Sequence, residues 1–287
     1  MTKPQPKIDT VVDDVYALFN PNHGHVPDED NLNAFAENLK QILRDRLAKR
    51  EALNNPLRFS SLGKKDRQLW YMANDYPQED ISAKTYFKFL YGDVIEQLLV
   101  FLVKEAGHVV TDEQKEVEVD GVKGHIDCKI DGVLVDVKSA SPFGFNKFVR
   151  NEVHVDDTFG YTQQLSGYSQ VETPEEGPAW LAMEKVNGSL ALTRLSQSIV
   201  KDYPVDARIA HLKTVIAQKE PPEKCYDDVE DGKSGNRRLA TGCSYCGFKH
   251  SCWPGLRTFL YSNGPRYLTK VVNEPNVPEV YDNVADG

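Results

Sequence analysis

Two aspartates and a lysine form the first candidate site of this chain, within residues 116–140. Two Asp-Gly pairs in this stretch predict two-residue hairpin turns between alternating apolar residues. If the second turn is such a hairpin, Asp127 faces Asp136 and His125 faces Lys138 on one side of a sheet. Opposed carboxylates repel, and a divalent cation held between them would offset the repulsion. A solvated edge, on which the acids pair with Lys138, is the alternative.

The turns themselves are Asp120-Gly121 and Asp131-Gly132, and they divide the stretch into three short expected strands. The side opposite the aspartates carries valines and isoleucines together with Cys128. We therefore expect one face of this small sheet to be core and the other to be chemical, with Cys128 buried in the core.

Two helices are expected to bring further polar groups to this sheet. Apolar residues at helical spacing predict a long helix over residues 82–106, in which Gly92 and Glu96 share a face. Glycine inside a helix usually marks close packing, which would bring Glu96 near the aspartates. A solvated Glu96 is the alternative. A second helix, over about residues 159–171, places Gln164 and Tyr168 one turn apart.

The remaining elements complete the expected architecture. Helical spacing runs from residue 30 to about residue 53, strands are expected at 178–186 and 189–195, and another helix at 196–218. The aromatic-rich stretch 139–157 is expected to be a loop, either a mobile flap or a packed surface loop. This order predicts a mixed α/β fold with a central, mostly antiparallel sheet.

Composition narrows the class of protein. The 287 residues are 40% hydrophobic and 27% charged, with a net charge of −9, which is unlike a protein that coats nucleic acid. The sequence has no apolar run of about 18 residues and no secretory signal, so we expect no membrane span and a cytoplasmic location. Cysteines in a reducing compartment suggest a metal site or inert thiols rather than disulfides.

Four of the five cysteines lie late in the chain, at Cys225, Cys243, Cys246 and Cys252. They lie in a segment rich in Gly, Ser, Asn and Lys, which is typical of irregular structure that needs a cross-link. Four thiolates bind zinc or hold an iron–sulfur cluster, and their spacing does not decide between the two. His250 is an alternative zinc ligand. Four unrelated free thiols would be unusual in so short a segment.

Four short motifs now occur in order along the chain: Gly92 to Glu96, Gly124-His125-Ile126-Asp127, Asp136-Val137-Lys138, and Gln164 to Tyr168. Together they resemble the PD-(D/E)XK nuclease superfamily, specifically its RecB-like branch of CRISPR-associated and phage-encoded exonucleases. The resemblance covers roughly residues 57–254. Each motif is weak alone, but the four in order on suitable elements form a specific pattern.

The resemblance implies an α/β restriction-endonuclease-like core of order αβββαβ, with a mixed central sheet flanked by helices. It also implies N-terminal helices and a cysteine-stapled C-terminal segment. The expected divisions are an N-terminal helical region, a nuclease core, a cysteine segment and an extended tail, at residues 1–56, 57–220, 221–256 and 257–287.

The same resemblance implies a hydrolase that cleaves phosphodiester bonds with Mg²⁺ or Mn²⁺. Glu96, Asp127 and Asp136 would hold the ions with the Val137 carbonyl, and Lys138 would act beside them. Gln164 and Tyr168 would position the DNA strand, and His125 is an additional candidate for contact with metal or phosphate. Basic residues expected to contact DNA are Lys64, Lys65, Arg67, Lys147 and Arg150, with Arg237, Arg238 and Lys249 near the cysteines. For Lys64, Lys65 and Arg67, a solvated basic turn over a buried Trp70 is the alternative.

Many members of that branch end in three cysteines that bind a [4Fe-4S] cluster, which Cys243, Cys246 and Cys252 match. The relatives take a fourth cysteine from upstream of the core, whereas residues 63–71 here contain none. Cys225 is therefore the expected fourth ligand, of a [4Fe-4S] cluster or of zinc. As the fourth ligand, Cys225 would close only the C-terminal segment instead of locking both ends of the domain.

The leading hypothesis is thus a DNA exonuclease that acts on ends of single- or double-stranded DNA in phage or bacterial recombination, repair or degradation. If phage-encoded, it would work in the host cytoplasm. A non-catalytic nucleic-acid- or protein-binding module of the same fold is the second hypothesis. A structure-specific endonuclease or an RNA nuclease is the third.

Overall fold

The structure is a computed structural model that describes residues 7–22, 24–48, 57–79, 82–172 and 177–280. The chain forms two compact units. Unit 1 consists of Met1–Gly63 and Ser82–Ala210, and unit 2 consists of Lys64–Ile81 and His211–Gly287. Of the helices among the described residues, none is both long enough and apolar enough to cross a lipid bilayer.

Unit 1 contains helices from its N-terminal end and helices between and after its strands. The helical elements are η1 (Ile8–Thr10), α1 (Val11–Ala17), α2 (Glu29–Leu47), η2 (Phe59–Ser61), α4 (Ala83–Glu105), α5 (Pro142–Val149), α6 (Tyr161–Glu172), α7 (Gln197–Lys201) and the first part of α8 (Val205–Ile216). The strands are β1 (Val110–Thr111), β2 (Glu116–Val119), β3 (Val122–His125), β4 (Cys128–Ile130), β5 (Val133–Ala140), β6 (Ala179–Glu184) and β7 (Leu190–Arg194).

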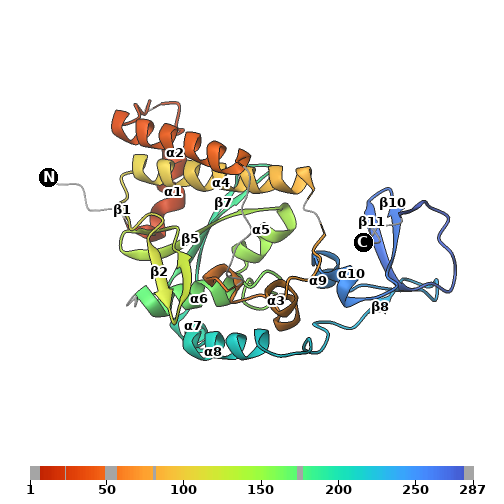
Figure 1. Cartoon of the computed structure of the whole chain (residues 1–287). Coiled ribbons are helices and arrows are strands. Elements are labelled where there is room, and N and C mark those ends of the chain that lie inside the picture. Colours follow the sequence, from red (N-terminus) through yellow and green to blue (C-terminus); the bar gives the residue numbers. More distant parts are fainter. Residues whose placement is uncertain (1–6, 23, 49–56, 80–81, 173–176, 281–287) are drawn as a thin grey trace. The chain divides into compact units, whose positions relative to one another are not determined.

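The central sheet of unit 1 has five strands in the order β1-β4-β5-β6-β7. β5 and β6 run parallel, and the other neighbours are antiparallel, so the sheet is mixed. Helices flank it, with α4 contacting β5 and α5 contacting β6 and β7 (Figure 1). The predicted mixed α/β architecture with a central sheet flanked by helices is confirmed at this level.

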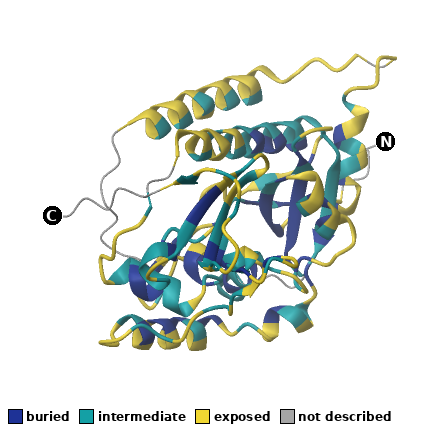
Figure 2. Ribbon diagram, turned by 90° about the vertical axis from the view of Figure 1, so that its right-hand side faces the viewer, coloured by how far each residue is buried: buried dark blue, intermediate teal, exposed yellow. Residues whose placement is uncertain are grey.

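Alternation along β5 assigns its side chains to two covered faces. Val133, Val135 and Val137 belong to the apolar cluster beneath α1 and α4. The intervening Leu134 and Asp136 are 1% and 4% exposed on the opposite face. Figure 2 shows this burial concentrated on the strands and on the helix sides turned toward them. The predicted core face of β5 is therefore confirmed, and Asp136 lies on the opposite face as expected, although helices α5 and α6 cover that face as well.

Both Asp-Gly turns are confirmed, since Asp120, Gly121, Asp131 and Gly132 all have positive φ, as a type I′ turn requires. The second turn pairs Ile130 with Val133 and Cys128 with Val135, which is the predicted register. Cys128 is fully buried in the core, as expected.

The predicted single strand before the second turn is divided, so the stretch holds four strands rather than three. The break falls at Ile126 and Asp127, whose backbone groups bond to Lys115 and Gln114 instead of to β5. β3 consequently pairs with β2 in a separate two-stranded sheet.

Two other elements differ from expectation, and both differences involve proline. The expected loop at 139–157 contains α5, because Ser141 caps its first turn by accepting from Gly144 N, and Pro142 suits a first helical position. The expected helix at 196–218 is split into α7 and α8 at Pro204, which lacks the N–H that a continuous helix needs. The helix expected to run to about residue 53 ends at Leu47, where Ala48 has an extended conformation; residues 49–53 lie outside the described residues.

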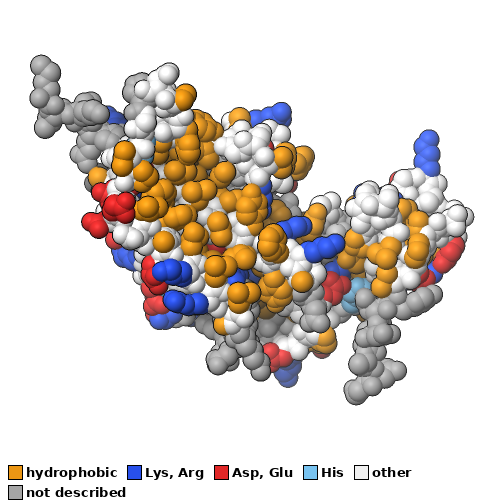
Figure 3. All heavy atoms as spheres, turned by 90° about the horizontal axis from the view of Figure 1, so that it is seen from above, with side chains coloured by type: hydrophobic (Ala, Val, Ile, Leu, Met, Phe, Trp, Pro, Cys, Tyr) orange, Lys and Arg blue, Asp and Glu red, His pale blue; other side chains and the backbone are white. Residues whose placement is uncertain are grey.

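Exposed aromatic side chains are numerous in unit 1, with Phe87 71% exposed on α4 and Phe143 77% exposed on α5. Figure 3 shows hydrophobic side chains spread over the side of unit 1 that is uppermost in Figure 1, with few charged groups among them. Exposure of an apolar group is therefore too common in this unit to indicate a site by itself.

Unit 2 combines one segment from before α4 with the C-terminal part of the chain. Its elements are α3 (Asp66–Ala73), the end of α8, β8 (Val229–Glu230), β9 (Arg237–Arg238), α9 (Thr241–Ser244), α10 (Lys249–Cys252), β10 (Arg257–Tyr261), β11 (Gly264–Lys270) and β12 (Glu279–Val280). The strands form one antiparallel sheet in the order β12-β10-β11-β9-β8.

Unit 2 differs from the expected divisions at both of its ends. Residues 257–280 do not form an extended tail, since β10 and β11 make a hairpin that joins this sheet. The segment 64–79 was expected in the nuclease core, yet it packs with the cysteine segment, where Trp70, Tyr71, Val215 and Phe248 form a small apolar cluster.

Candidate functional site

Acidic side chains and one lysine meet at the middle of β5 in unit 1. Lys138 Nζ lies 2.5 Å from Asp136 Oδ2, and Asp136 is almost fully buried. Asp127 lies directly before β4, where its Oδ2 accepts a hydrogen bond of 2.7 Å from Val137 N. β4 pairs with β5 only as far as Val135, so the Asp127 carboxylate accepts the Val137 N–H that a longer β4 would have bonded. The structure brings together the three residues at the centre of the sequence prediction.

Glu96 reaches the same place from α4. Gln114 donates from Nε2 to Glu96 Oε1 at 2.9 Å and from its backbone N to the Asp127 carbonyl at 3.1 Å. Gln114 therefore links the helical acid to the strand acid, and it does so with a positive φ of 52°. Such a conformation costs free energy in a residue other than glycine and persists where the surroundings enforce it. Gln114 was not predicted from the sequence, because nothing in its local pattern distinguishes it.

The carboxyl groups of this cluster have strongly perturbed acidities. Burial, and then the neighbouring Asp127, raise the pKa of Glu96 to about 8. Burial, and then Asp136, raise the pKa of Asp127 to about 7, and burial also raises the pKa of Asp136. These shifts have the direction expected where like charges are crowded together away from water.

Lys138 responds in the opposite sense to its surroundings. Burial disfavours its ammonium group, but the carboxylates of Asp136 and Asp127 outweigh this and raise the pKa of Lys138 above its usual range. Lys138 is therefore a permanent cation at neutral pH.

Tyr161 is a member of this site that was not predicted from the sequence. Lys138 Nζ lies 5.2 Å from the centre of the Tyr161 ring, a cation–π distance, and burial raises the pKa of the Tyr161 hydroxyl. Tyr161 precedes Gln164 by three residues and Tyr168 by seven, so all three lie on one side of α6. That spacing is the signal by which the sequence could have identified it.

Tyr168 is fixed by packing against two other residues. Its ring stacks on Phe59 with centroids 4.8 Å apart, and both rings are buried. A Cβ on Gly124 would lie 2.6 Å from the Tyr168 hydroxyl and 2.5 Å from the Phe59 Cβ, so only glycine fits there. Burial raises the pKa of Tyr168 to about 12, and Gln164 hydrogen-bonds the hydroxyl group.

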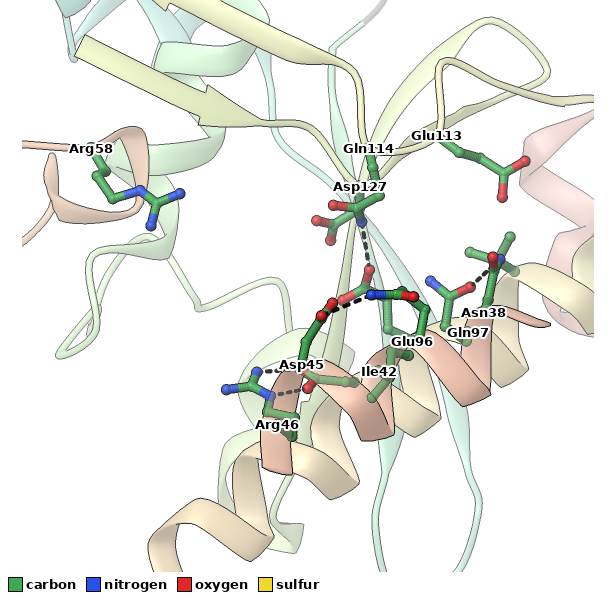
Figure 4. Close-up of a pocket in the computed structure, with 13 residues that line it drawn as sticks. Asn38, Ile42, Asp45, Arg46, Arg58, Glu96, Gln97, Glu113, Gln114 and Asp127 are labelled. Carbon is green, nitrogen blue, oxygen red and sulfur yellow. Dashed lines mark hydrogen bonds and ion pairs between the residues drawn. The ribbon is translucent and has the colours of Figure 1, made fainter. Parts of the chain in front are cut away.

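A pocket of about 990 Å³ opens beside Glu96 and Asp127 between α2 and α4. Figure 4 shows both carboxylates at its wall, with Arg58 extending its guanidinium toward the same space. Arg58 is exposed and makes no ion pair with any described residue. A second arginine at the pocket, Arg46, is instead paired with Asp93. Arg58 was not predicted from the sequence.

Two predictions about neighbouring residues need correction. His125 does not face Lys138; it pairs with Glu116 in the β2–β3 hairpin, and its ring is 41% exposed. The break at Asp127 removes it from the β4–β5 ladder. Gly92 is not required by close packing, because a Cβ there would meet Ser139 Oγ at 3.4 Å, an ordinary contact.

The late cysteines in unit 2 lie close enough for their thiols to influence one another. Burial, followed by the other three thiols, raises the pKa of Cys243 to about 11. Arg67 Nε donates to Cys252 Sγ at 3.2 Å, and backbone N–H groups of Gln68 and Arg67 donate to the Cys225 sulfur. The segment upstream of the core thus contacts these cysteines by hydrogen bonds, although it contributes no thiol.

The predicted basic residues fall into different surroundings. Arg67 is engaged with Cys252, the Pro222 carbonyl and the Tyr71 hydroxyl. Lys147 Nζ lies 2.6 Å from Asp156 Oδ2, and Lys65 lies over the Tyr226 ring. Burial lowers the pKa of Lys64, and Arg150 is exposed at the end of α5.

The described residues contain no group of three or more His, Cys, Asp or Glu side chains arranged to hold a metal ion. Neither the carboxylates around Lys138 nor the four late cysteines are therefore in a ligating arrangement in this structure. Their donor chemistry nevertheless fits: oxygen atoms suit Mg²⁺ or Mn²⁺, and thiols suit zinc or iron.

Comparison with known proteins finds no protein-family model that matches and no curated protein that matches. Similar solved structures include the following two. One is the crystal structure of SSO0001, with TM-score 0.41 and 16% identity, covering 75% of this chain and 94% of that chain. The other is LHK-Exo in complex with dAMP, with TM-score 0.37 and 14% identity, covering 62% of this chain and 94% of that one. Both likenesses are distant, and neither identifies a fold or a function here.

Proposed function

We propose that this protein is a metal-dependent nuclease that hydrolyses phosphodiester bonds in DNA. The observation that carries the proposal is the meeting of Asp127, Asp136 and Lys138 at the middle of β5, with Glu96 linked to them through Gln114. Structural ion pairs rarely need three acids for one lysine. A surplus of carboxylates, one buried and two partly buried, beside an open pocket is what a divalent cation and a phosphate substrate require.

Glu96, Asp127 and Asp136 would hold Mg²⁺ or Mn²⁺, with the Val137 carbonyl as a further oxygen ligand. When bound, such an ion polarises a phosphoryl oxygen and acidifies a coordinated water. The raised pKa values of Glu96 and Asp127 support this role, because a bound cation would stabilise the charged forms that burial now disfavours.

Lys138 would contribute as a fixed positive charge. Because its pKa lies above the usual range, it does not accept a proton at neutral pH. It would instead stabilise the negative charge that develops on the phosphoryl group during attack. Its distance of 5.2 Å from the Tyr161 ring favours one orientation of the ammonium group.

Arg58 is a candidate for binding a phosphate next to the one that is cleaved. It extends toward the pocket that Glu96 and Asp127 line, and no described acid neutralises it. A guanidinium binds phosphate in a bidentate manner, so Arg58 would orient the strand relative to the acids.

Digestion of end-labelled single- and double-stranded DNA with Mg²⁺ or Mn²⁺ tests this function. Asp136→Asn and Lys138→Met should each lower the rate by at least about 100-fold, because each removes charge at the reacting group. Asp45→Asn is the matched control, since Asp45 lines the same pocket but is exposed on α2. Equal rates in all three variants would overturn the assignment.

The same experiment separates the alternatives. Binding of DNA without cleavage by any divalent ion would favour a non-catalytic module. Cleavage of RNA or of branched DNA in preference to linear ends would redefine the substrate while leaving the catalytic residues in place.

We also propose that Cys225, Cys243, Cys246 and Cys252 bind a [4Fe-4S] cluster, with zinc as the alternative. Burial and neighbouring thiols raise the pKa of Cys243 and Cys246, so these two would need a bound cation to be thiolates at neutral pH. Broad absorption near about 400 nm would identify the cluster, whereas a colourless protein with one equivalent of zinc would identify the zinc site.

A further inference from the structure

A pair of aromatic rings leads from Lys138 to the surface of unit 1. Tyr161 lies under the Lys138 ammonium, and Phe159 stacks on Tyr161 with centroids 5.5 Å apart and an angle of 28° between the rings. Phe159 is 62% exposed. Many apolar side chains of this unit are exposed, but Phe159 is stacked on a ring that contacts the candidate catalytic lysine.

The backbone that carries these rings is held rigidly. The Asp157 carboxylate accepts hydrogen bonds of 2.7 to 3.0 Å from the backbone N–H groups of Gly160, Tyr161 and Thr162. Gly160 has a φ of +77° and packs directly against Gly63, where a Cβ would come within 2.3 Å of the Gly63 Cα. An exposed aromatic ring on an immobilised turn loses little conformational freedom when a ligand stacks on it.

The turn that carries Phe159 and Tyr161 suits a flat, apolar ligand and not an anion. The N–H groups at the start of α6 already bind the Asp157 carboxylate, so they are not available to a phosphate. A flat, apolar surface beside a permanent cation suits a nucleobase whose phosphate lies near Lys138.

We propose that Phe159 and Tyr161 form a stacking ledge for one unpaired base of a single-stranded DNA segment, next to the phosphate that Lys138 contacts. This inference rests on the proposed function for the presence of a nucleic-acid strand at Lys138. It adds that the substrate is single-stranded at this point, because a base that stacks on a protein ring is no longer stacked and paired in a duplex.

The test measures binding, independently of cleavage. The probe is a single-stranded oligonucleotide with 2-aminopurine at its end, titrated into the Asp136→Asn protein, with fluorescence quenching reporting the stacking of the base. Phe159→Ala should weaken binding by about 5- to 100-fold, the range found when a base-stacking ring is removed. Phe159→Trp should keep the affinity, and Phe159→Leu, which keeps bulk without a ring, should behave like alanine.

Two controls make the result specific. Phe19→Ala removes a ring that is 67% exposed after α1, and it should leave the affinity unchanged. An oligonucleotide with an abasic end should bind the Asp136→Asn protein as weakly as the 2-aminopurine oligonucleotide binds the protein that also carries Phe159→Ala. The Phe159→Ala change should not weaken binding of the abasic oligonucleotide any further. An equal loss for both oligonucleotides, or no loss for either, would overturn the ledge.

Failure of the ledge and failure of the proposed function have different signatures. If the parent protein cleaves DNA but Phe159→Ala binds and quenches normally, the nuclease stands and the ledge falls. If quenching depends on Phe159 but the protein cleaves nothing with Mg²⁺ or Mn²⁺, the ledge stands and the hydrolase assignment falls.

Discussion

The two units hold their chemical side chains in different ways. In unit 1, Asp136 and Lys138 project from a strand in the middle of a five-stranded sheet, and Glu96 projects from a helix of 23 residues. In unit 2, Cys243 and Cys252 lie on helices of four residues each. The carboxylates of unit 1 are thus held by a long helix and a hydrogen-bonded strand, whereas the cysteines of unit 2 are held by short helical turns.

This difference has an energetic consequence. Buried side chains on both faces of the sheet fix the carboxylates of unit 1 before any ligand arrives. The cysteines of unit 2 are supported by an apolar cluster built on four buried residues. So small a core supplies little stability, and such regions depend on metals or cross-links. We therefore expect a bound cation to serve chemistry in unit 1 and folding in unit 2.

Replacing one cysteine of unit 2 should have the largest effect. Cys243→Ser removes one ligand of the proposed metal site, and in small zinc domains the bound metal contributes about 10–16 kcal/mol to folding. Unit 2 should lose its structure while unit 1 keeps its own. Limited proteolysis with mass spectrometry should show new cleavage within residues 211–280 and unchanged protection of residues 82–172.

The matched control for this variant is Cys128→Ser. Cys128 is fully buried in the core of unit 1, where a hydroxyl without a partner costs about 1–3 kcal/mol. The new cleavage should then appear in unit 1. An unchanged protease pattern in Cys243→Ser would contradict a folding role for the late cysteines.

Within unit 1, two glycines test how rigid the carboxylate scaffold is. Gly124→Ala places a Cβ 2.5 Å from that of Phe59, and the resulting overpacking should destabilise the protein by about 2–3 kcal/mol. Gly92→Ala meets an ordinary contact and should stabilise α4 by up to about 1 kcal/mol. Thermal unfolding measures both. A Gly124→Ala protein as stable as the parent would show that Phe59 and Tyr168 can move aside for the added Cβ.

These features also show what the sequence could and could not predict. The pairing of Cys128 with Val135 followed from the Asp-Gly turn, because a two-residue turn fixes the register locally. The break at Asp127 did not follow, because the chain there continues the register of the first hairpin, bonding to Lys115 and Gln114, instead of the register of the second.

The same distinction explains the other outcomes. The carboxylates and Lys138 could be identified from their types and spacing, whereas Arg58 could not, because its position depends on how separate segments pack. The grouping of α3 with the cysteine segment depends on Trp70, Tyr71 and Phe248, whose contact no local pattern indicates. Local turn chemistry was predictable, and long-range packing was not.

The pH dependence of stability should distinguish the carboxylate site from the rest of the metal-free protein. The pKa values of Asp127 and Glu96 are raised to about 7 and about 8, so the folded state binds more protons than the unfolded state between about pH 4 and pH 8. Their stabilisation is complete below the unfolded pKa values and is lost as the pH rises through the folded ones. The free energy of unfolding should therefore fall as the pH rises from about 5 to about 8.

Thermal melts of the metal-free protein at pH 5, 6, 7 and 8 would follow this loss, and Asp127→Asn should flatten the profile. Added Mn²⁺ should reverse the trend, raising the melting temperature more at pH 8 than at pH 6, because the ion binds the deprotonated acids. If neither Asp127→Asn nor Mn²⁺ changed the pH profile, these carboxyl groups would not form a cation site.

The smallest expected effects concern two arginines, one from each unit, that the sequence alone treated alike. Arg67 donates to Cys252 Sγ and the Tyr71 hydroxyl, so Arg67→Ala should lower the stability of unit 2 by about 1.5 kcal/mol. Arg150 is exposed, so Arg150→Ala should leave stability unchanged and reduce the salt dependence of DNA binding by about one phosphate contact. Chemical denaturation and binding titrations at several salt concentrations measure the two quantities. If Arg67→Ala instead reduced the salt dependence at constant stability, its contacts with the cysteine segment would be incidental, and unit 2 would bind DNA directly.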